Sequence, residues 1–391
     1  MFAVLTPARK VLWRLVALLS ILWLAACQTV TTGGGGPRIN PDDAVPVALL
    51  VPRGGGNPGD DVLAQSLENA ARLAIADLDG VAIDLRVYAT GGNAAQAQQS
   101  AKQAVSDGAK IILGPVYAES ANAVAVAVAP RNINVLSFSN NTTIAGGNLW
   151  VLGPTFQNTA DRLVNYATAQ GKSRILVVHS SDVAGQLGNQ AIQQAISTAG
   201  ATLAGTVSHE FSQQGVVNAV PQIVATARGN AADAIFMTAN SAGALPLLSQ
   251  MLPEAGLGPD VAQYIGLSRW DIPAQTLDLP GVQNGWFAVP DPQKSAAFRS
   301  RYEAANGSAP HPIGSLAYDG IAAIGALVKN GQSNALSGAA LTQSAGFQGT
   351  GGIFRLLPNG TNQRGLAVAT IRNRQVVVID PAPRAFGGAG L

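Results

Sequence analysis

Polar side chains directly follow several of the short apolar runs in this chain. Such runs predict buried strands, and the carboxyl ends of parallel strands meet at one edge of a sheet, where ligands gather. Hydroxyl, amide and carboxylate groups at that edge suit the binding of a small polar molecule. Each group could also cap the helix that follows, and for any single residue capping is the favoured interpretation. The segments are Val51-Pro52-Arg53, Gly114-Pro115-Val116-Tyr117, Ser137-Phe138-Ser139-Asn140-Asn141-Thr142, Ser180-Ser181-Asp182, Ala239-Asn240 and Ser268-Arg269-Trp270-Asp271.

Motifs of catalysis and of cofactor binding are incomplete or absent in this sequence. The stretch GGGNPG (54–59) matches G-x-G-x-x-G, but Pro58 lies inside the turn and no ribose-binding acid follows the strand at 82–88. The sequence has no G-x-S-x-G elbow. We therefore expect a protein that is not an enzyme and binds no cofactor or metal; an enzyme would need turnover that depends on Ser139 or Asp182. The three histidines lack the spacing of metal ligands: His179, His209 and His311.

The N-terminal segment predicts export and lipid attachment. Three basic residues precede an apolar run from Leu15 to Ala26, which is too short to span a bilayer. The run ends in Leu24-Ala25-Ala26-Cys27, which resembles the lipobox of bacterial lipoproteins and implies acylation of Cys27, the only cysteine. The alternative is an ordinary signal peptide with Cys27 as a free thiol. Gln28, where an aspartate would retain a lipoprotein at the inner membrane, favours the outer membrane.

The charge balance excludes the partners that need a strongly charged surface. The chain has 24 Lys and Arg residues against 22 Asp and Glu residues, and the predicted signal peptide (1–26) contains three of the basic ones. The mature chain is therefore nearly neutral, which gives no reason to expect nucleic acid as a partner.

Strand-like and helix-like stretches alternate along the rest of the chain. Residues 27–44 carry the predicted lipid site and a Gly/Pro-rich linker. Further along the chain, a helix is predicted after Asp60-Asp61. The AVAVAVA run (123–129) is ambiguous between strand and helix, and we assign it to a helix. This alternation predicts an α/β fold with two doubly wound parallel sheets. The predicted strands are 45–51, 82–88, 110–114 and 133–139 in the first half, and 174–180, 201–211, 231–239, 263–268 and 285–290 in the second; 352–357, 366–373 and 375–379 are strand-like as well.

Several segments carry a family resemblance. IILGP followed by a helix and INVLSFS, the AYDGI helix (317–321) and FQGTGGIFRLLPNG (347–360) resemble the type I periplasmic binding proteins of the leucine/isoleucine/valine-binding group. The resemblance implies two lobes that are joined by three crossovers and close over a ligand. One lobe would comprise 45–153 and about 294–350, the other 154–293 and about 351–380, with 381–391 as a tail.

The sequence departs from the amino-acid binders of this family at two single positions and in the TANSAGALPLL loop (238–248), where an expected aromatic wall residue is absent. Ala118 stands where they have a hydroxyl for the ligand carboxylate, and Ala184 stands where they have an aromatic residue. Asp271 could serve the ligand ammonium, so only half of the expected clamp is visible. The residues we predict to line a ligand cleft are Tyr117, Ser120, Ser139, Asn141, Thr142, Asp182 and Asp271, with Trp270 and Trp286 either as an apolar wall or as ordinary core packing.

Two functions remain open. SRWDIPAQTLDLPGVQNGWFAVPDP (268–292), together with the lipobox, resembles the lipoproteins known as penicillin-binding-protein activators. That resemblance implies a non-enzymatic periplasmic lipoprotein, anchored in the outer membrane, which regulates peptidoglycan synthesis by binding a penicillin-binding protein. The alternative is a substrate-binding protein that delivers an amino acid or a similar small polar solute to the permease of an ABC importer.

Overall fold

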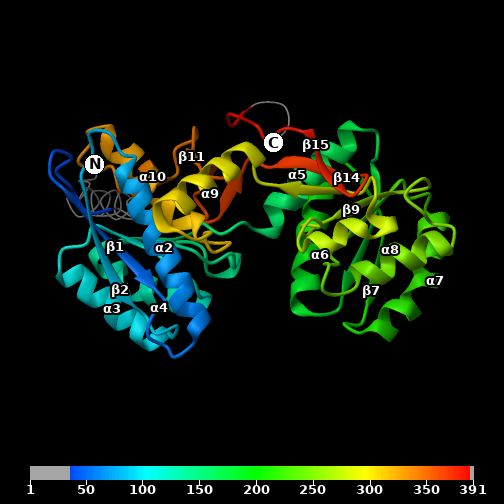
Figure 1. Cartoon of the computed structure of the whole chain (residues 1–391), viewed down its shortest axis with the longest axis horizontal. Helices are drawn as coiled ribbons and strands as arrows, with labels where there is room; N and C mark the ends of the chain where they lie inside the picture. The colour runs from blue at the N-terminus through cyan, green and yellow to red at the C-terminus, as the bar shows by residue number, and fades with distance from the viewer. Residues whose placement is uncertain (1–35, 388–391) are drawn as a thin grey trace, which may run out of the picture. The chain divides into compact units, whose positions relative to one another are not determined.

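A computed structural model describes residues 36–387 as two lobes of α/β structure. The first lobe is built on a five-stranded sheet with the strand order β2-β1-β3-β4-β5, in which every pairing is parallel. Figure 1 shows helices α2, α3, α4 and α10 beside its strands. The strands are β1 (Val45–Val51), β2 (Ile83–Ala89), β3 (Ile111–Leu113), β4 (Asn134–Ser137) and β5 (Leu149–Val151), and the helices of this lobe are α2 (Pro58–Ala76), α3 (Ala94–Ser106), α4 (Ala118–Val128), α9 (Pro292–Asn306), α10 (Ser315–Lys329) and α11 (Gly338–Leu341).

The second lobe is built on a seven-stranded sheet with the order β15-β14-β10-β9-β8-β6-β7. Its five strands from β7 to β10 are parallel, whereas β14 and β15 join one edge as antiparallel strands. The predicted α/β fold with parallel sheets is confirmed, with this antiparallel edge as an addition. The strands are β6 (Arg174–Ser180), β7 (Thr202–His209), β8 (Ala234–Met237), β9 (Gln263–Gly266), β10 (Trp286–Val289), β14 (Ala367–Arg372) and β15 (Gln375–Asp380), and the helices are α5 (Phe156–Ala169), α6 (Val183–Thr198), α7 (Gln213–Gly229) and α8 (Leu245–Glu254).

The chain passes between the two lobes three times. Leu152 and Leu163 belong to the cores of the first and second lobes respectively, and the chain returns to the first core at Phe298. A small antiparallel sheet of β11 (Phe347–Gly349), β12 (Gly352–Leu356) and β13 (Asn362–Arg364) precedes the third passage. The side chains of Phe347 and Phe354 in this sheet pack in the first-lobe core.

Local signals explain where individual elements begin and end. Helix α2 begins at Pro58, ahead of the start predicted after Asp60-Asp61, because Asn57 accepts a hydrogen bond from the Gly59 amide and Pro58 suits the first helical position. The AVAVAVA run lies within helix α4 and its 3-10 extension, as predicted. The α4 side chains are buried at 121, 124, 125 and 128, which is the spacing of one helical face.

Gly114 ends strand β3 with a turn that only glycine tolerates well. Its φ of 86° is left-handed, and a Cβ there would lie 2.3 Å from the carbonyl oxygen of Leu50. The chain thereby reaches Tyr117 and the start of α4 at the carboxyl edge of the first sheet. None of the helices within 36–387 is long and apolar enough to cross a membrane.

Candidate functional site

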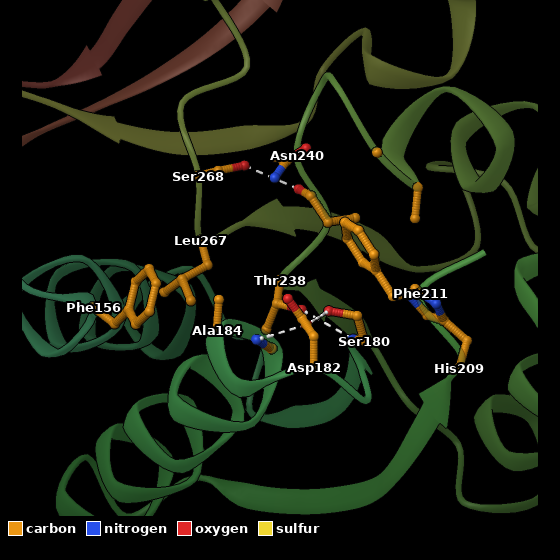
Figure 2. A pocket seen from close by; sticks show the side chains of 14 residues that line it. Phe156, Ser180, Asp182, Ala184, His209, Phe211, Thr238, Asn240, Leu267 and Ser268 are labelled. Atoms are coloured by element: carbon orange, nitrogen blue, oxygen red, sulfur yellow. Dashed lines mark hydrogen bonds between the residues drawn. The ribbon is translucent and has the colours of Figure 1, made fainter. Parts of the chain in front are cut away.

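A pocket of about 110 Å³ lies at the carboxyl ends of four parallel strands of the second lobe. Strands β6 and β7 end at Ser180 and His209, and Thr238 and Leu267 directly follow β8 and β9. Figure 2 shows Phe156 and Leu267 on one side, His209 and Phe211 on the other. The lining residues are Phe156, Ser180, Asp182, Ala184, Gly185, His209, Phe211, Thr238, Ala239, Asn240, Gly243, Ala244, Leu267 and Ser268.

Asp182 is the carboxylate of this pocket, and its surroundings keep it ionised. Its Oδ1 accepts a hydrogen bond from the Gly185 amide at 3.1 Å, so the side chain caps helix α6. The same oxygen accepts a hydrogen bond from the Ser180 hydroxyl, and this bond lowers the pKa of Asp182 below its usual value. Asp182 was predicted as a cleft residue, and the structure places it in the pocket and also in the capping role.

His209 lies on the opposite side and has a buried nitrogen without a partner. Only 4% of the residue is exposed. Its Nδ1 lies 2.8 Å from the carbonyl oxygen of Glu210, and because a carbonyl only accepts, Nδ1 carries the proton in this hydrogen bond. Nε2 is then an acceptor, and it has no hydrogen-bond partner among the described residues. No sequence motif marks His209 as a site residue, although it ends strand β7 as Ser180 ends β6.

Two exposed aromatic side chains provide apolar surface that the sequence analysis did not identify. Phe156 at the start of α5 is 38% exposed, and Phe211 in the loop after β7 is 70% exposed. Ala184, where amino-acid binders of the family are expected to carry an aromatic residue, also lines the pocket. The apolar wall here therefore comes from other positions than Ala184.

The first lobe has a corresponding hollow of about 550 Å³ at the carboxyl edge of its own sheet. The Tyr117 hydroxyl donates a hydrogen bond to Oδ1 of Asp60, and this bond raises the pKa of Tyr117. Tyr117 and Ser120, both predicted cleft residues, line this hollow together. The lining residues are Asp60, Gly91, Gly92, Asn93, Ala94, Tyr117, Ala118, Glu119 and Ser120.

Three predicted cleft residues lie in the turn after β4, and two of them are hydrogen-bonded to each other. The Ser139 hydroxyl accepts a hydrogen bond from the Asn141 amide at 3.1 Å, and Oδ1 of Asn141 accepts one from the Thr143 amide at 2.9 Å. Thr142 is exposed. These residues line neither of the two pockets described above, and their contact with a ligand stays a prediction.

Asp271 and the two tryptophans have partners of their own. Arg269 donates a hydrogen bond from Nε to Oδ1 of Asp271 at 2.9 Å, so the carboxylate is already paired with a guanidinium. Trp270 has no exposed surface and stacks on Phe287 with ring centroids 6.4 Å apart. Trp286 packs against Tyr166 at 4.9 Å. Of the two interpretations of these tryptophans, core packing is the one that their surroundings match.

The ionisable side chains that line the two pockets are similar in charge. Asp60 and Glu119 line the first-lobe hollow, Asp182 and His209 line the second-lobe pocket, and neither set contains a lysine or an arginine. Among residues 36–387, no group of three His, Cys, Asp or Glu side chains is placed to hold a metal ion. The two pockets therefore contain carboxylates without a lysine or arginine side chain to balance them.

Comparisons with known proteins assign the chain to a family. The family model described as periplasmic binding protein matches residues 44–375, so the chain belongs to the periplasmic binding protein family. No curated protein matches the sequence.

Solved structures share the fold at low sequence identity. A protein described as a branched-chain amino acid ABC transporter of Rhodospirillum rubrum is 18% identical, with a TM-score of 0.73, over 86% of this chain and 100% of its own. An ABC transporter substrate-binding protein from Desulfitobacterium hafniense, in complex with Leu, is 16% identical, with a TM-score of 0.60, over 86% and 100%. A branched-chain amino acid transporter substrate-binding protein from Streptococcus pneumoniae, in complex with isoleucine, is 13% identical, with a TM-score of 0.55, over 87% and 100%. At these identities the likeness concerns the fold.

Proposed function

We propose that this protein is a substrate-binding protein that captures a small polar solute and delivers it to the permease of an ABC importer. The observation that supports this most is the second-lobe pocket, where hydroxyl, amide and carboxylate groups converge beside two exposed aromatic rings at the carboxyl ends of parallel strands. Ligands of open α/β sheets bind at that edge. The family and the structural neighbours, two of which hold an amino acid, agree with this function.

The proposal includes an extracytoplasmic location and no catalysis. Family members of this kind bind a solute without converting it, and the two pockets contain no nucleophile-and-base pair beyond the capping contact of Ser180 with Asp182. The predicted lipid anchor at Cys27 lies outside the described residues. An anchor in the inner membrane would hold the protein near the importer, whereas the outer-membrane address that Gln28 favours would argue against this function.

A solute screen tests the proposal. The full protein, purified in detergent, is heated with amino acids, small amides, amines and carboxylates, and a solute that binds only the folded state raises the melting midpoint. At about 100 times its dissociation constant, a ligand adds about 2.7 kcal/mol to the free energy of unfolding. Titration calorimetry then measures the affinity of each hit. The proposal fails if no solute in the panel shifts the midpoint.

The residues at three specific positions support a second function. Ala118 and Ala184 replace two ligand-holding side chains expected from the family, and Asp271 is paired with Arg269. These features favour the regulatory alternative, in which the fold binds a penicillin-binding protein and controls peptidoglycan synthesis from the outer membrane. Capture of a purified penicillin-binding protein, together with a flat solute screen, would establish this alternative. A hit in the screen with no capture would exclude it.

A further inference from the structure

We propose that the second-lobe pocket recognises the protonated primary amine of its solute, with His209 Nε2 and the Asp182 carboxylate as the two acceptors. The proposal rests on the proposed solute-binding function and names the chemical class of the solute. It requires no carboxylate on the ligand, which separates it from recognition of an amino acid through both of its charged ends.

The orphaned nitrogen of His209 is the first support. The bond from Nδ1 to the Glu210 carbonyl, 2.8 Å long, fixes the tautomer and leaves Nε2 with a lone pair. A buried acceptor without a donor is unfavourable, and native proteins rarely keep one without a reason. A ligand N–H supplies the missing donor. His209 lines the pocket and is 96% buried, so the imidazole is held in place before the ligand arrives.

His179 shows that the Nδ1 contact alone does not produce this state. It is the last residue but one of strand β6, whereas His209 ends β7, and its Nδ1 lies 2.8 Å from the Ser180 carbonyl. His179 is also buried, yet its Nε2 is absent from the buried, unpartnered atoms of the described residues, and the residue does not line the pocket. The two histidines therefore form a matched pair that differs in access to the pocket.

The charge at the pocket favours a cation over an anion. Asp182 stays ionised because the Ser180 hydroxyl lowers its pKa, and both hydrogen bonds from Ser180 and Gly185 go to Oδ1. No lysine or arginine lines the pocket to neutralise it. A ligand carboxylate would face this like charge, whereas an ammonium is attracted to it and donates up to three hydrogen bonds.

The aromatic walls add to the same preference. Aromatic faces attract cations, and their apolar surface suits the hydrocarbon part of an amine. Figure 2 shows Phe211 and His209 on the same side of the pocket. Phe211 is 70% exposed, so its ring offers apolar surface at the mouth of the pocket that the core does not use.

Three compounds that share one hydrocarbon part separate the recognised groups. Leucine carries both charges, isoamylamine lacks the carboxylate, and isocaproate lacks the ammonium. Binding is measured by thermal shift and titration calorimetry on the full protein in detergent, with putrescine as a second amine. We expect isoamylamine or putrescine to bind and isocaproate to be inert.

Three variants then test the two acceptors. Asp182→Asn keeps a good helix cap and removes the charge. His209→Asn keeps an N–H near the position of Nδ1 and removes the Nε2 acceptor. We expect each to weaken amine binding about tenfold or more, which is the value of one charge-assisted hydrogen bond. His179→Asn, the matched control, should leave the affinity within about twofold.

The imidazole itself gives an independent readout. A long-range proton–nitrogen spectrum of the histidine-labelled protein should show Nε2 of His209 as an unprotonated nitrogen whose resonance moves when the amine is added. A tautomer with the proton on Nε2 in the ligand-free protein would overturn the inference. So would binding of isocaproate but of neither amine, or amine binding that both pocket variants leave unchanged; in these cases solute capture itself stands. If neither the amines nor any other solute binds, both this inference and the proposed function fail.

Discussion

The buried ion pair between Asp319 and Arg364 allows a quantitative test of what holds the third chain passage in place. Oδ2 of Asp319 lies 3.1 Å from Nη1 of Arg364, and their side chains are 1% and 11% exposed. Oδ1 accepts two hydrogen bonds from Thr350, at 2.7 Å from its amide and 3.0 Å from its hydroxyl. Arg364 also donates to the carbonyl of Leu152, next to the first passage between the lobes.

The substitution Asp319→Asn preserves the shape and the acceptor for Thr350 but leaves the Arg364 charge buried without its counterion. Removing one partner of a buried pair costs about 3–5 kcal/mol of the free energy of unfolding. Unfolding entropy near 2.1 cal/mol/K per residue, over the length of residues 36–387, gives about 0.7 kcal/mol per degree. We therefore expect the melting midpoint to fall by about 4–7 °C.

Scanning calorimetry and urea unfolding followed by tryptophan fluorescence measure this loss. The matched control is Asp79→Asn, which breaks the ion pair of Asp79 with Lys329, whose N–O distance is 3.5 Å and whose side chains are 96% and 62% exposed. An exposed pair contributes less than about 1 kcal/mol, so the control should shift the midpoint by about 1 °C or less. Adding Arg364→Met to Asp319→Asn removes the stranded charge and should recover part of the loss. Equal shifts in Asp319→Asn and Asp79→Asn would refute the reasoning.

Three further predictions concern other parts of the chain. Gly266→Ala places a Cβ 2.3 Å from the Trp270 indole, so we expect a loss of about 1–3 kcal/mol in urea unfolding, and an unchanged midpoint would contradict this packing. The hydrogen bond from the Ser180 hydroxyl lowers the pKa of Asp182 in the folded protein. This contact therefore stabilises the fold above the unfolded carboxyl pKa of about 3.9, and the stabilisation is lost as the pH falls through the folded pKa. Ser180→Ala should raise the pH at which the Asp182 carboxyl titrates by carbon NMR, and an unmoved titration would exclude the contact. Cys27→Ser should abolish labelling by palmitate and release the protein from the membrane fraction; persistent labelling would disprove the predicted anchor.

The sequence was sufficient for most strands because their apolar runs are continuous. Residues 45–51 and 174–180 were predicted with the bounds that β1 and β6 have. Helix α5 was not among the predicted elements, although its apolar residues at 160, 163, 164 and 167 recur at helical spacing. Asn158 and Arg162 occupy core positions of α5, where they donate to the carbonyls of Asn362 and Leu366, about 204 residues further along the chain. Their partners could not be known from the local pattern, so the contacts that hold this helix in place were not predictable from the sequence.

The same limit applies to the candidate site. Asp182 was identifiable because a carboxylate directly follows a clear strand, and Tyr117 and Ser120 because they follow the third strand. The predicted strand 201–211 runs two residues beyond the end of β7 at His209, so His209 was not recognised as the end of the strand and Phe211 was assigned to the strand. Whether a histidine nitrogen lacks a partner depends on packing from other elements, and the sequence has no local mark of that.

The electrostatics of the two carboxyl edges bear on the choice between an amino acid and an amine. Helix α4 begins at Ala118 without a side-chain cap, so its first amides could hold a ligand carboxylate. Asp60, hydrogen-bonded to Tyr117 in the same hollow, places a carboxylate beside those amides and opposes a second anion there. The loss of the expected hydroxyl at Ala118 removes a further donor for that anion. In the second lobe, the Asp182 carboxylate and His209 Nε2 are both acceptors, and they favour a hydrogen-bond donor on the ligand. Both edges thus disfavour the carboxylate end of an amino acid, and an amine is the solute that leaves neither Asp60 nor Asp182 facing a like charge.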